Sequence, residues 1–538
     1  MLVHSLVGLY DILLTAGKVP PVGRSNLTSL YTMADISAEG ELLGLSEPVR
    51  TETGVLNPVP MQGGHTNSGD DPFFLCDNFK FIFNIGTKGG TQFKASSKLH
   101  KHLLQKVKSK PLQAVYKFFN RNPVGARHPV IKQYLKDYKD ADKVWVLFYH
   151  KGKPALNKEA WDIWDKEYSA RQTALPLLDT IDSGMAPVIE THPKIKGRGC
   201  GGLGAALISN NADCSKSFDI EGGYNAPVSS IGAFKYTTAL TYVLSSKQAA
   251  PLGDCVVAFW AGAVELSVLA GALDFKTISK EGAVELAGAV QDIRRGKLPD
   301  SYASLRNTPF TCCVFKPNSS RLALKYLWTA ELDTVIQNIG AWWSGVETSP
   351  YILGSLLTGT GTFDALPDPY KLALYRHIMF ATPLQEYFLY LAVNRYKLSM
   401  LKSAYKKPIG KFVTYYIKER RTPMTTPFKV GQLFALLESI QYAANKQDSI
   451  QKLFKAACET PGAQIPRLRK AAQSIYLPQI EGGLRYWYQK QLSELSSEIG
   501  ELAPAKRYTL AEQAEFISGY DSEVCKRFKK STANAEEK

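Results

Sequence analysis

The stretch Thr426–Ile440, which reads TPFKVGQLFALLESI, contains the clearest helical pattern of the chain. Thr426 suits an N-cap, and Pro427 suits the first helical position because its missing N–H has no helical partner to lose. Apolar residues then recur at helical spacing, as Val430, Leu433, Phe434, Leu437 and Ile440. This stretch predicts an amphipathic helix that buries one face.

Three further helical patterns follow it. Pro466 opens one, Ile480 to Ile499 carries another, and Thr509 with Glu512 forms a capping box ahead of the last. Short loops join all four patterns, which is typical of a small helical bundle. We therefore predict a C-terminal helical bundle over 424–538.

The preceding residues mix both kinds of secondary structure. Met1–Ala16 has leucines at helical spacing, and the segments at 29–33 and 41–45 flank a Glu-Gly turn that predicts a hairpin. We expect buried strands at 255–260 and 311–315 and a long helix over 320–343. The predicted fold class is α+β: a mixed α/β N-terminal region (1–365), a basic helical connector (366–423) and the all-α bundle. A length of 538 residues agrees with several domains.

Charge is distributed unevenly along the chain. Lys and Arg total 65 against 49 Asp and Glu, a formal net charge of +16, which points to polyanionic partners. The segment 78–136 has 13 basic residues and no acidic one. We expect Lys98, Lys101 and Lys108 on the outer face of a helix there, facing phosphates. The alternative is a solvated lysine face without a partner.

A glycine-rich loop at 197–204 is the next candidate site. It matches GxGxxG, but no apolar strand precedes it, which disfavours dinucleotide binding. Glycines allow close approach to a phosphate or groove edge, and Lys196 and Arg198 supply positive charge. A plain surface loop and a nucleotide-dependent enzyme are the alternatives.

Two more basic groups lie toward the C-terminus. In the connector, lysines and arginines alternate with tyrosines and Phe412, a composition that suits a nucleic-acid strand. The alternative is a helix that packs its aromatic residues inward. The candidate contacts from both groups are Lys407, Lys411, Arg420 and Arg421, and then Arg467, Arg469 and Lys470 in the bundle.

Catalytic signatures are missing from the sequence. There is no GxxxxGK[ST] phosphate loop, no GxSxG elbow and no histidine at metal-ligand spacing from a carboxylate or cysteine. We therefore predict no catalytic residue, no metal and no cofactor. The longest uncharged apolar stretches are too short to cross a bilayer, and the cysteine pattern is that of reduced thiols, so we expect a cytoplasmic protein without a membrane partner.

Several ordered segments resemble the large subunit of the type I-C CRISPR Cascade complex. The resemblance spans nearly the whole chain and departs from the family at Thr66–Gly69, where family members often carry Arg-Thr-Ser-Gly. That departure puts a basic contact there in doubt. The matching segments are the opening helix with its Pro20–Gly23 loop, 67–69 with Pro72–Asn78, Ser209–Asp213, Gly223–Ser229, Tyr236–Leu240, Gly253–Trp260, Lys316–Arg321 and Val430–Glu438.

The resemblance implies a non-enzymatic subunit of an RNA-guided complex. Such a subunit contacts guide CRISPR RNA, reads a protospacer-adjacent motif on double-stranded target DNA, helps to open the duplex and supports recruitment of a helicase-nuclease. Its other implied partners are the backbone and guide-end-binding Cascade subunits and a small subunit equivalent to the bundle. The alternative function is a general RNA-binding ribonucleoprotein scaffold.

Small polar loops would suit motif reading in the minor groove, where amides meet base acceptors and the guanine amino group. Asn78 and Asn225 have an alternative role, since each can hydrogen-bond its own turn. The candidate motif-reading residues are Lys18, Arg24, Ser25 and Asn26, then Asn67, Ser68 and Asn78, then Asn210, Asn211 and Asn225.

Overall fold

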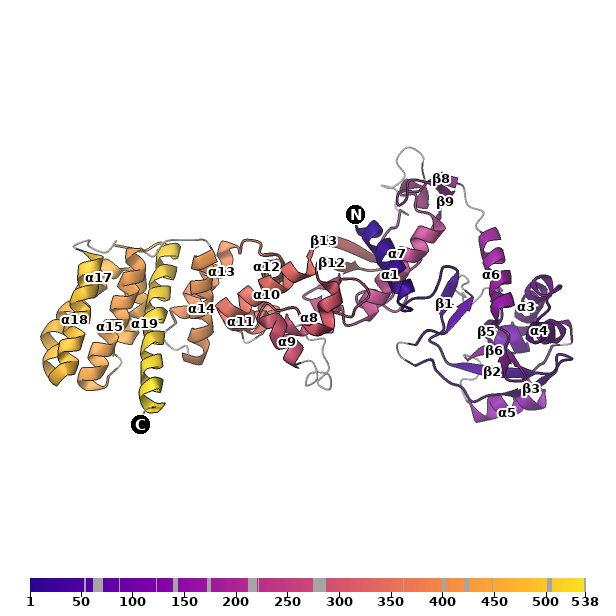
Figure 1. Cartoon of the computed structure of the whole chain (residues 1–538), viewed down its shortest axis with the longest axis horizontal. Helices are drawn as coiled ribbons and strands as arrows, with labels where there is room; N and C mark the ends of the chain where they lie inside the picture. Colours follow the sequence, from indigo (N-terminus) through magenta and orange to yellow (C-terminus); the bar gives the residue numbers. More distant parts are fainter. Residues whose placement is uncertain are drawn as a thin grey trace. The chain divides into compact units, whose positions relative to one another are not determined.

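The structure, a computed structural model, forms two compact units. The first unit comprises Met1–Ser245 and Asn318–Leu322, and the second comprises Ser246–Pro317 and Ala323–Lys538 (Figure 1). The structure describes all residues except 53–54, 61–70, 87, 122, 139–143, 172–175, 211–219, 221, 274–286, 361, 399–402, 420–424, 448, 501–505 and 537–538.

A small mixed sheet organises part of the first unit. Its strands run in the order β3-β2-β6-β5, with β2 parallel to β6 and the other neighbours antiparallel. The β2–β3 hairpin confirms the predicted one, and its turn needs Gly40, because a Cβ there would lie 2.4 Å from the backbone nitrogen of Phe118. The strands are β2 (Tyr31–Ile36), β3 (Leu42–Leu45), β5 (Cys76–Asn78), β6 (Trp145–His150) and β7 (Lys153–Pro154), which pairs with β6.

Five helices share the core of this sheet. Their apolar faces meet in a cluster rich in phenylalanine, in which Phe118, Phe119 and Phe148 make edge-on contacts. Their basic side chains therefore remain on the outside. The helices are α2 (Phe79–Phe83), α3 (Gly89–Leu103), α4 (Lys110–Asn120), α5 (Pro129–Asp137) and α6 (Lys158–Ala170).

The rest of the first unit is built on two packed helices, α1 (Leu2–Thr15) and α7 (Ser230–Ser245). Tyr10 of α1 meets Phe234 of α7 edge-on, and its hydroxyl donates to the carbonyl of Pro20 at 2.8 Å. This hydrogen bond fixes the proline loop that follows α1. Two short antiparallel pairs complete the unit: β1 (Arg24–Asn26) with β4 (Pro58–Pro60), and β8 (Pro176–Leu178) with β9 (Met185–Pro187).

The second unit begins with a four-stranded sheet. Its strands follow the order β10-β11-β12-β13, and β11 and β12 contain the two strands that the sequence predicts. The predicted helix over 320–343 is wrong in its first half, because apolar residues at 322, 324, 326, 328 and 330 alternate with strand period. The strands are β10 (Ala249–Leu252), β11 (Cys255–Trp260), β12 (Pro309–Asn318) and β13 (Arg321–Glu331).

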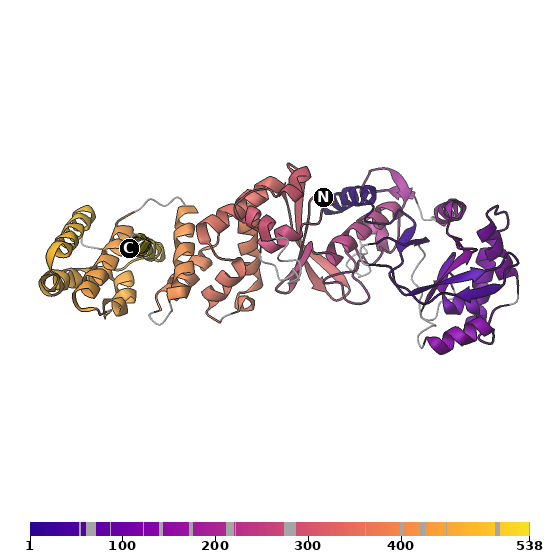
Figure 2. The same cartoon turned by 60° about the horizontal axis from the view of Figure 1, so that its bottom comes forward.

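Helices form the remainder of the second unit, and those toward the C-terminus are orange and yellow in Figure 1 and Figure 2. One face of the sheet and all of these helices share a single apolar core. The helices are α8 (Ser267–Ala272), α9 (Ala287–Arg294), α10 (Leu332–Val346), α11 (Pro350–Thr358), α12 (Asp368–Phe380), α13 (Glu386–Tyr396), α14 (Ser403–Glu419), α15 (Thr426–Asn445), α16 (Phe454–Glu459), α17 (Pro461–Ala471), α18 (Gly482–Ile499) and α19 (Leu510–Glu536). The α+β prediction is confirmed.

The predicted helix starts in the bundle are correct only in part. The capping box at Thr509 and Glu512 is present, with Glu512 accepting from the Thr509 backbone N–H at 2.7 Å. Helix α15 takes Thr425 as its N-cap, one residue earlier than predicted. Pro466 lies inside α17, which begins at Pro461, because burial of Ile465 and Leu468 holds the helix through the second proline. The predicted boundary at 423 lies outside the described residues.

Candidate nucleic-acid interface

The glycine-rich loop is closed at its base by a pair of backbone hydrogen bonds. The N–H of Ile195 donates to the carbonyl of Ala205 at 2.8 Å, and the N–H of Ala205 donates back at 2.9 Å. The N–H of Arg198 donates to the carbonyl of Leu244 at 3.0 Å, and that of Lys196 to Thr241 Oγ1 at 3.2 Å. The loop is therefore anchored on the C-terminal half of α7.

Two of its glycines are required by close approach. Gly197 has φ +111°, and a Cβ there would lie 2.8 Å from the backbone of Leu244. Gly204 has φ +77°, and a Cβ there would lie 2.8 Å from the carbonyl oxygen of Ile195. Larger residues would push the loop off α7 and open its base. The GxGxxG match thus reflects backbone packing of a surface loop, with no helix beginning directly after it.

The loop and the residues just before it present charge and one apolar side chain. Lys194, Lys196 and Arg198 are exposed, and no ion pair of the described residues involves them. Leu203 is 94% exposed, the highest value among the large apolar residues that the structure describes. The anchored loop and the residues just before it therefore carry three exposed cations and one exposed leucine.

The acid-free segment holds its basic residues on several elements. Lys98 lies exposed on α3, whereas Lys101 is half-buried. Lys108 is exposed but lies beyond α3, which ends at Leu103, so the prediction of one helical face for all three lysines is wrong. Lys108 lies just before α4, where both carboxylate oxygens of Glu159 accept backbone N–H groups, from Lys108 at 2.8 Å and from Ser109 at 2.7 Å.

His100 belongs to the core rather than to this basic surface. Its Nε2 accepts from the backbone N–H of Leu75 at 2.9 Å, and its Nδ1 lies 2.8 Å from the carbonyl oxygen of Ser96. Its ring also stacks on Phe119, with centroids 4.0 Å apart. Burial lowers the pKa of His100 to about 4, so the ring is neutral and adds no charge at neutral pH.

The N-terminal candidate residues divide into exposed and engaged side chains. Lys18 and Ser25 are exposed on the proline loop and on β1. The Arg24 guanidinium lies 3.2 Å from Asp165 and 4.1 Å from the ring centroid of Trp161. Asn26 Oδ1 accepts from the backbone N–H of Asn57 at 2.6 Å. Arg24 and Asn26 thus hold the fold together at this point.

Two of the other candidate asparagines are also engaged locally. Asn78 Oδ1 caps α2 by accepting from the backbone N–H of Lys80 at 3.1 Å. The amide of Asn225 donates to the carbonyls of Ile220 and Gly222. These bonds are the alternative roles that the sequence left open for both residues. Asn210 is half-buried, with its Nδ2 unpaired among the described atoms. Asn67, Ser68 and Asn211 lie outside the described residues.

The basic connector packs most of its aromatic residues inward. Phe412 and Tyr416 of α14 are buried, and the hydroxyl of Tyr415 lies 2.7 Å from His377 Nε2. Lys411 is paired with Glu347, whereas Lys407 is exposed. The inward-packing alternative therefore holds for these rings. Arg420 and Arg421 lie outside the described residues.

The candidate basic residues of the bundle lie on α17, and α18 adds a group of basic and aromatic side chains. Arg467 and Lys470 are exposed, and Arg469 is half-buried. Tyr486 is 72% exposed and follows Arg485 directly. Trp487 and Leu484, two apolar residues of the helical pattern at 480–499, are 38% and 51% exposed. The run Arg485-Tyr486-Trp487 was a usable signal, because basic and aromatic side chains alternate in nucleic-acid surfaces.

A second exposed aromatic group lies on β13, in the segment that the sequence wrongly predicts as a helix. Tyr326 on β13 stacks on Trp328 with centroids 5.0 Å apart and planes 11° apart, and it is 42% exposed. The guanidinium of Arg376 lies 5.4 Å from the ring centroid of Trp328. The period-two apolar pattern of this strand was the signal that could have found it.

No group of three or more His, Cys, Asp or Glu residues could hold a metal ion within the described part of the chain. None of the described helices is both long and apolar enough to cross a membrane.

The comparisons with known proteins assign the family. A search of the curated proteins found no match. The family model described as CRISPR-associated protein (Cas_Csd1) matches residues 6–528, which is nearly the whole chain. This range includes most of each unit and every candidate site described above. The chain therefore belongs to the CRISPR-associated Csd1 family, in agreement with its resemblance to the large subunit of the type I-C Cascade complex.

Proposed function

We propose that this Cascade subunit recognises a protospacer-adjacent motif on double-stranded target DNA, helps to open the duplex and contacts guide RNA. In this proposal it also supports recruitment of a helicase-nuclease and has no catalytic centre of its own. Base pairing with the guide then reads the remaining sequence, and the protein reads only the short motif and the shape of the duplex.

The glycine-rich loop is the observation that carries this proposal. Lys194 and Lys196 just before the loop and Arg198 within it are exposed and provide cations for phosphates. The backbone hydrogen bonds to α7 hold the loop in one position. A loop held at its base loses little conformational entropy when it binds, which favours its use as a recognition element. Glycine at 199, 201 and 202 leaves the loop backbone open to close approach by a groove edge.

Leu203 supports a role in duplex opening. Proteins that bend or open DNA commonly insert an apolar side chain between base steps, where it replaces part of the lost stacking. Leu203 is 94% exposed beside cations that can hold the flanking phosphates. Because contact with water is unfavourable for an apolar side chain, contact with unstacked bases would lower its free energy.

The basic surface of the first unit supports backbone contacts. Lys98 and Lys108 are exposed and lie in a segment that contains no acidic residue. Such a surface attracts any polyanion and does not discriminate between sequences. We assign this basic surface to the phosphates of the duplex or the guide. We assign discrimination between DNA sequences to the glycine-rich loop.

The test uses the complex assembled from this chain, the other Cascade subunits and guide RNA. Binding is measured to a duplex with the motif, to the same duplex with the motif scrambled, and to single-stranded RNA of equal length. We expect the double variant Lys196→Ala, Arg198→Ala to weaken binding to both duplexes and to leave guide loading unchanged. The matched control is Lys158→Ala, Lys166→Ala, two exposed lysines on α6.

The outcomes separate this function from its alternative. Preference for the motif-bearing duplex over the scrambled duplex supports motif recognition. Equal binding to both duplexes, with tighter binding to the RNA, would contradict the proposal and favour a general RNA-binding scaffold.

A further inference from the structure

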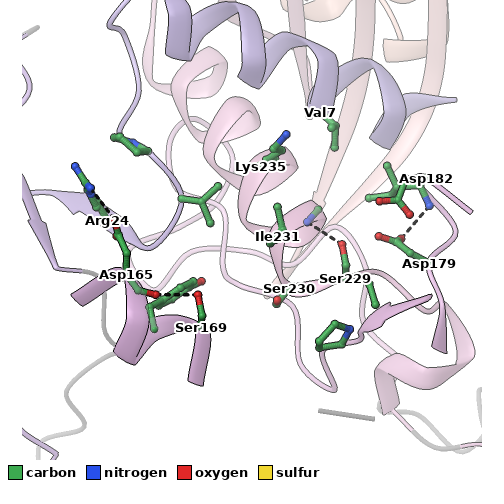
Figure 3. Close-up of a pocket in the computed structure, with 17 residues that line it drawn as sticks. Val7, Arg24, Asp165, Ser169, Asp179, Asp182, Ser229, Ser230, Ile231 and Lys235 are labelled. Carbon is green, nitrogen blue, oxygen red and sulfur yellow. Dashed lines mark hydrogen bonds and ion pairs between the residues drawn. The ribbon is translucent and has the colours of Figure 1, made fainter. Parts of the chain in front are cut away.

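A pocket of about 680 Å³ lies within the first unit, between α1, the end of α6, the start of α7 and β9. Figure 3 shows its lining residues, with the Arg24–Asp165 pair at one end and the carboxylates of Asp179 and Asp182 at the other. This volume falls in the range of small-molecule sites, which is about 300–1,000 Å³. No residue of the glycine-rich loop lines the pocket, and the function proposed above does not use it.

The walls between the two ends are largely apolar. They are formed by side chains from three helices and the segments between them, which come together only in the folded unit. An occupant with an apolar stem would therefore replace water along most of the pocket. The apolar wall residues are Val7, Pro21, Val22, Ile181, Ala186, Pro187 and Ile231, with the ring of Tyr168.

The cations that line the pocket already have carboxylate partners. Arg24 lies 3.2 Å from Asp165 Oδ2, and Lys235 Nζ lies 2.8 Å from Oδ1 of Asp11. Asp179 and Asp182 form no ion pair with any described residue. The Asp179 end of the pocket thus carries uncompensated negative charge.

Asp179 is the lining residue whose carboxylate has an oxygen without a partner among the described residues. Its side chain is buried, with the residue only 1% exposed, and its Oδ1 accepts from the backbone N–H of Ile181 at 2.9 Å. Its Oδ2 is buried and has no hydrogen-bond partner among the described residues. A buried carboxylate oxygen without a donor is unfavourable, and a cationic donor is its strongest available partner.

We propose that this pocket binds an alkylammonium or alkylguanidinium group, with the cation on Asp179 Oδ2 and the apolar stem along Val22 and Ile231. Two aspartates are too few ligands for a protein-held divalent cation, in keeping with the absence of any three-ligand cluster from the described residues. Lysine or arginine side chains of another protein and free polyamines share this chemistry.

Isothermal titration calorimetry of the full chain tests the proposal with two probes, spermidine and the peptide Gly-Arg-Gly. We expect at least one probe to bind. We expect Asp179→Asn to weaken the affinity for that probe by about tenfold or more, since a charge-assisted hydrogen bond is lost. The amide oxygen of the substituted side chain can still accept from Ile181, so the local turn is preserved. The matched control, Asp162→Asn, changes an exposed aspartate of α6 outside the pocket.

A second variant, Ser230→Phe, places a ring in the pocket and leaves Asp179 intact. It should abolish binding of the same probe, which keeps the test decisive if Asp179→Asn fails to fold. Binding of spermidine alone identifies a free polyamine as the ligand, and binding of the peptide alone identifies a protein side chain. Failure of both probes to bind, or equal binding by wild type and Ser230→Phe, would overturn the proposal.

Discussion

Lys397 Nζ lies 2.7 Å from Glu459 Oε1, and this ion pair joins the end of α13 to the end of α16. The same ammonium group donates to Oε1 of Gln513 in α19 at 2.9 Å. The side chain of Lys397 is only 8% exposed. Residues on both sides of the predicted boundary at 423 therefore share one buried polar contact within the continuous core of the second unit.

Replacing Lys397 by Met should destabilise the second unit by about 3 kcal/mol. Removal of one partner from a buried ion pair costs about 3–5 kcal/mol, and the partial exposure of Glu459 favours the lower end. Urea unfolding followed by circular dichroism measures the change. Lys418→Met, at an exposed position of α14, is the control and should change stability by less than about 0.5 kcal/mol. Equal stability of the two variants would show that the buried contact contributes nothing.

Asp521 should make the stability of the second unit depend on pH. Burial raises its pKa from 3.8 to about 6, and Tyr396 is its hydrogen-bond partner at 3.4 Å. The folded state therefore binds more protons than the unfolded state between about pH 4 and 6, so this group's contribution falls as pH rises through that window. The full effect is about 3 kcal/mol.

Asp521→Asn removes this titration and should be more stable than wild type at pH 7. Unfolding measured from pH 4.5 to 7.5 should show the difference between the two proteins shrinking as pH falls toward 4.5. The comparison between variants is needed because His100 and His192, with pKa values lowered to about 4 by burial, reduce stability as pH falls, which is the opposite direction. A difference that stays constant with pH would exclude a raised pKa at Asp521.

Asn26 and Asn78 should act on stability rather than on motif discrimination. Asn26→Ala leaves the half-buried N–H of Asn57 without its acceptor, and Asn78→Ala removes the N-cap of α2. Each should cost about 1 kcal/mol. Asn26→Asp keeps the accepting oxygen and is the control. Melting temperatures check the change, and an unchanged melting temperature with lost motif discrimination would instead assign Asn26 to base reading.

Local patterns in the sequence were sufficient for much of the fold. The helix that starts near Thr426, the capping box at Thr509 and the hairpin around Gly40 depend on neighbouring residues alone, so their patterns predict them. The error at 320–331 arose because a run of apolar residues fits either a helix or a strand until its period is checked. The helix start predicted at Pro466 was also wrong, because tertiary packing stabilises α17 on both sides of this proline.

The candidate site was less predictable, because burial of polar residues depends on distant partners. Burial against Leu75 and Phe119 lowers the pKa of His100 and keeps its ring neutral well below neutral pH. Arg24 has its partner, Asp165, 141 residues away. Such distant pairs cannot be predicted from neighbouring residues. Exposure could be predicted from local composition for Lys98, Lys108 and the cations of the glycine-rich loop.

Replacing Lys98 and Lys108 by Ala should flatten the salt dependence of duplex binding by the assembled complex. Each lost phosphate contact lowers the log–log salt slope by about 0.9, so the pair should lower it by about 1.8. The loop at Lys108 should persist, because Glu159 binds backbone N–H groups there. Affinities for motif-bearing and scrambled duplexes should fall by equal factors. The control is again Lys158→Ala, Lys166→Ala, and an unchanged slope in the test variant would remove these lysines from the interface.

Leu203→Ala should impair duplex opening without weakening the fold. Because the side chain is 94% exposed, its loss should change stability by less than about 0.5 kcal/mol. A leucine placed against unstacked bases gains about 1.5 kcal/mol or more from apolar burial, so the opening equilibrium should fall by about tenfold. The fluorescence of 2-aminopurine placed beside the motif reports opening in the assembled complex. A target with a preformed bubble at that position should restore full binding by the variant, since the step that Leu203 assists is then already complete. Normal fluorescence with Leu203→Ala, or a defect that the bubble does not repair, would mean that this side chain does not open the duplex.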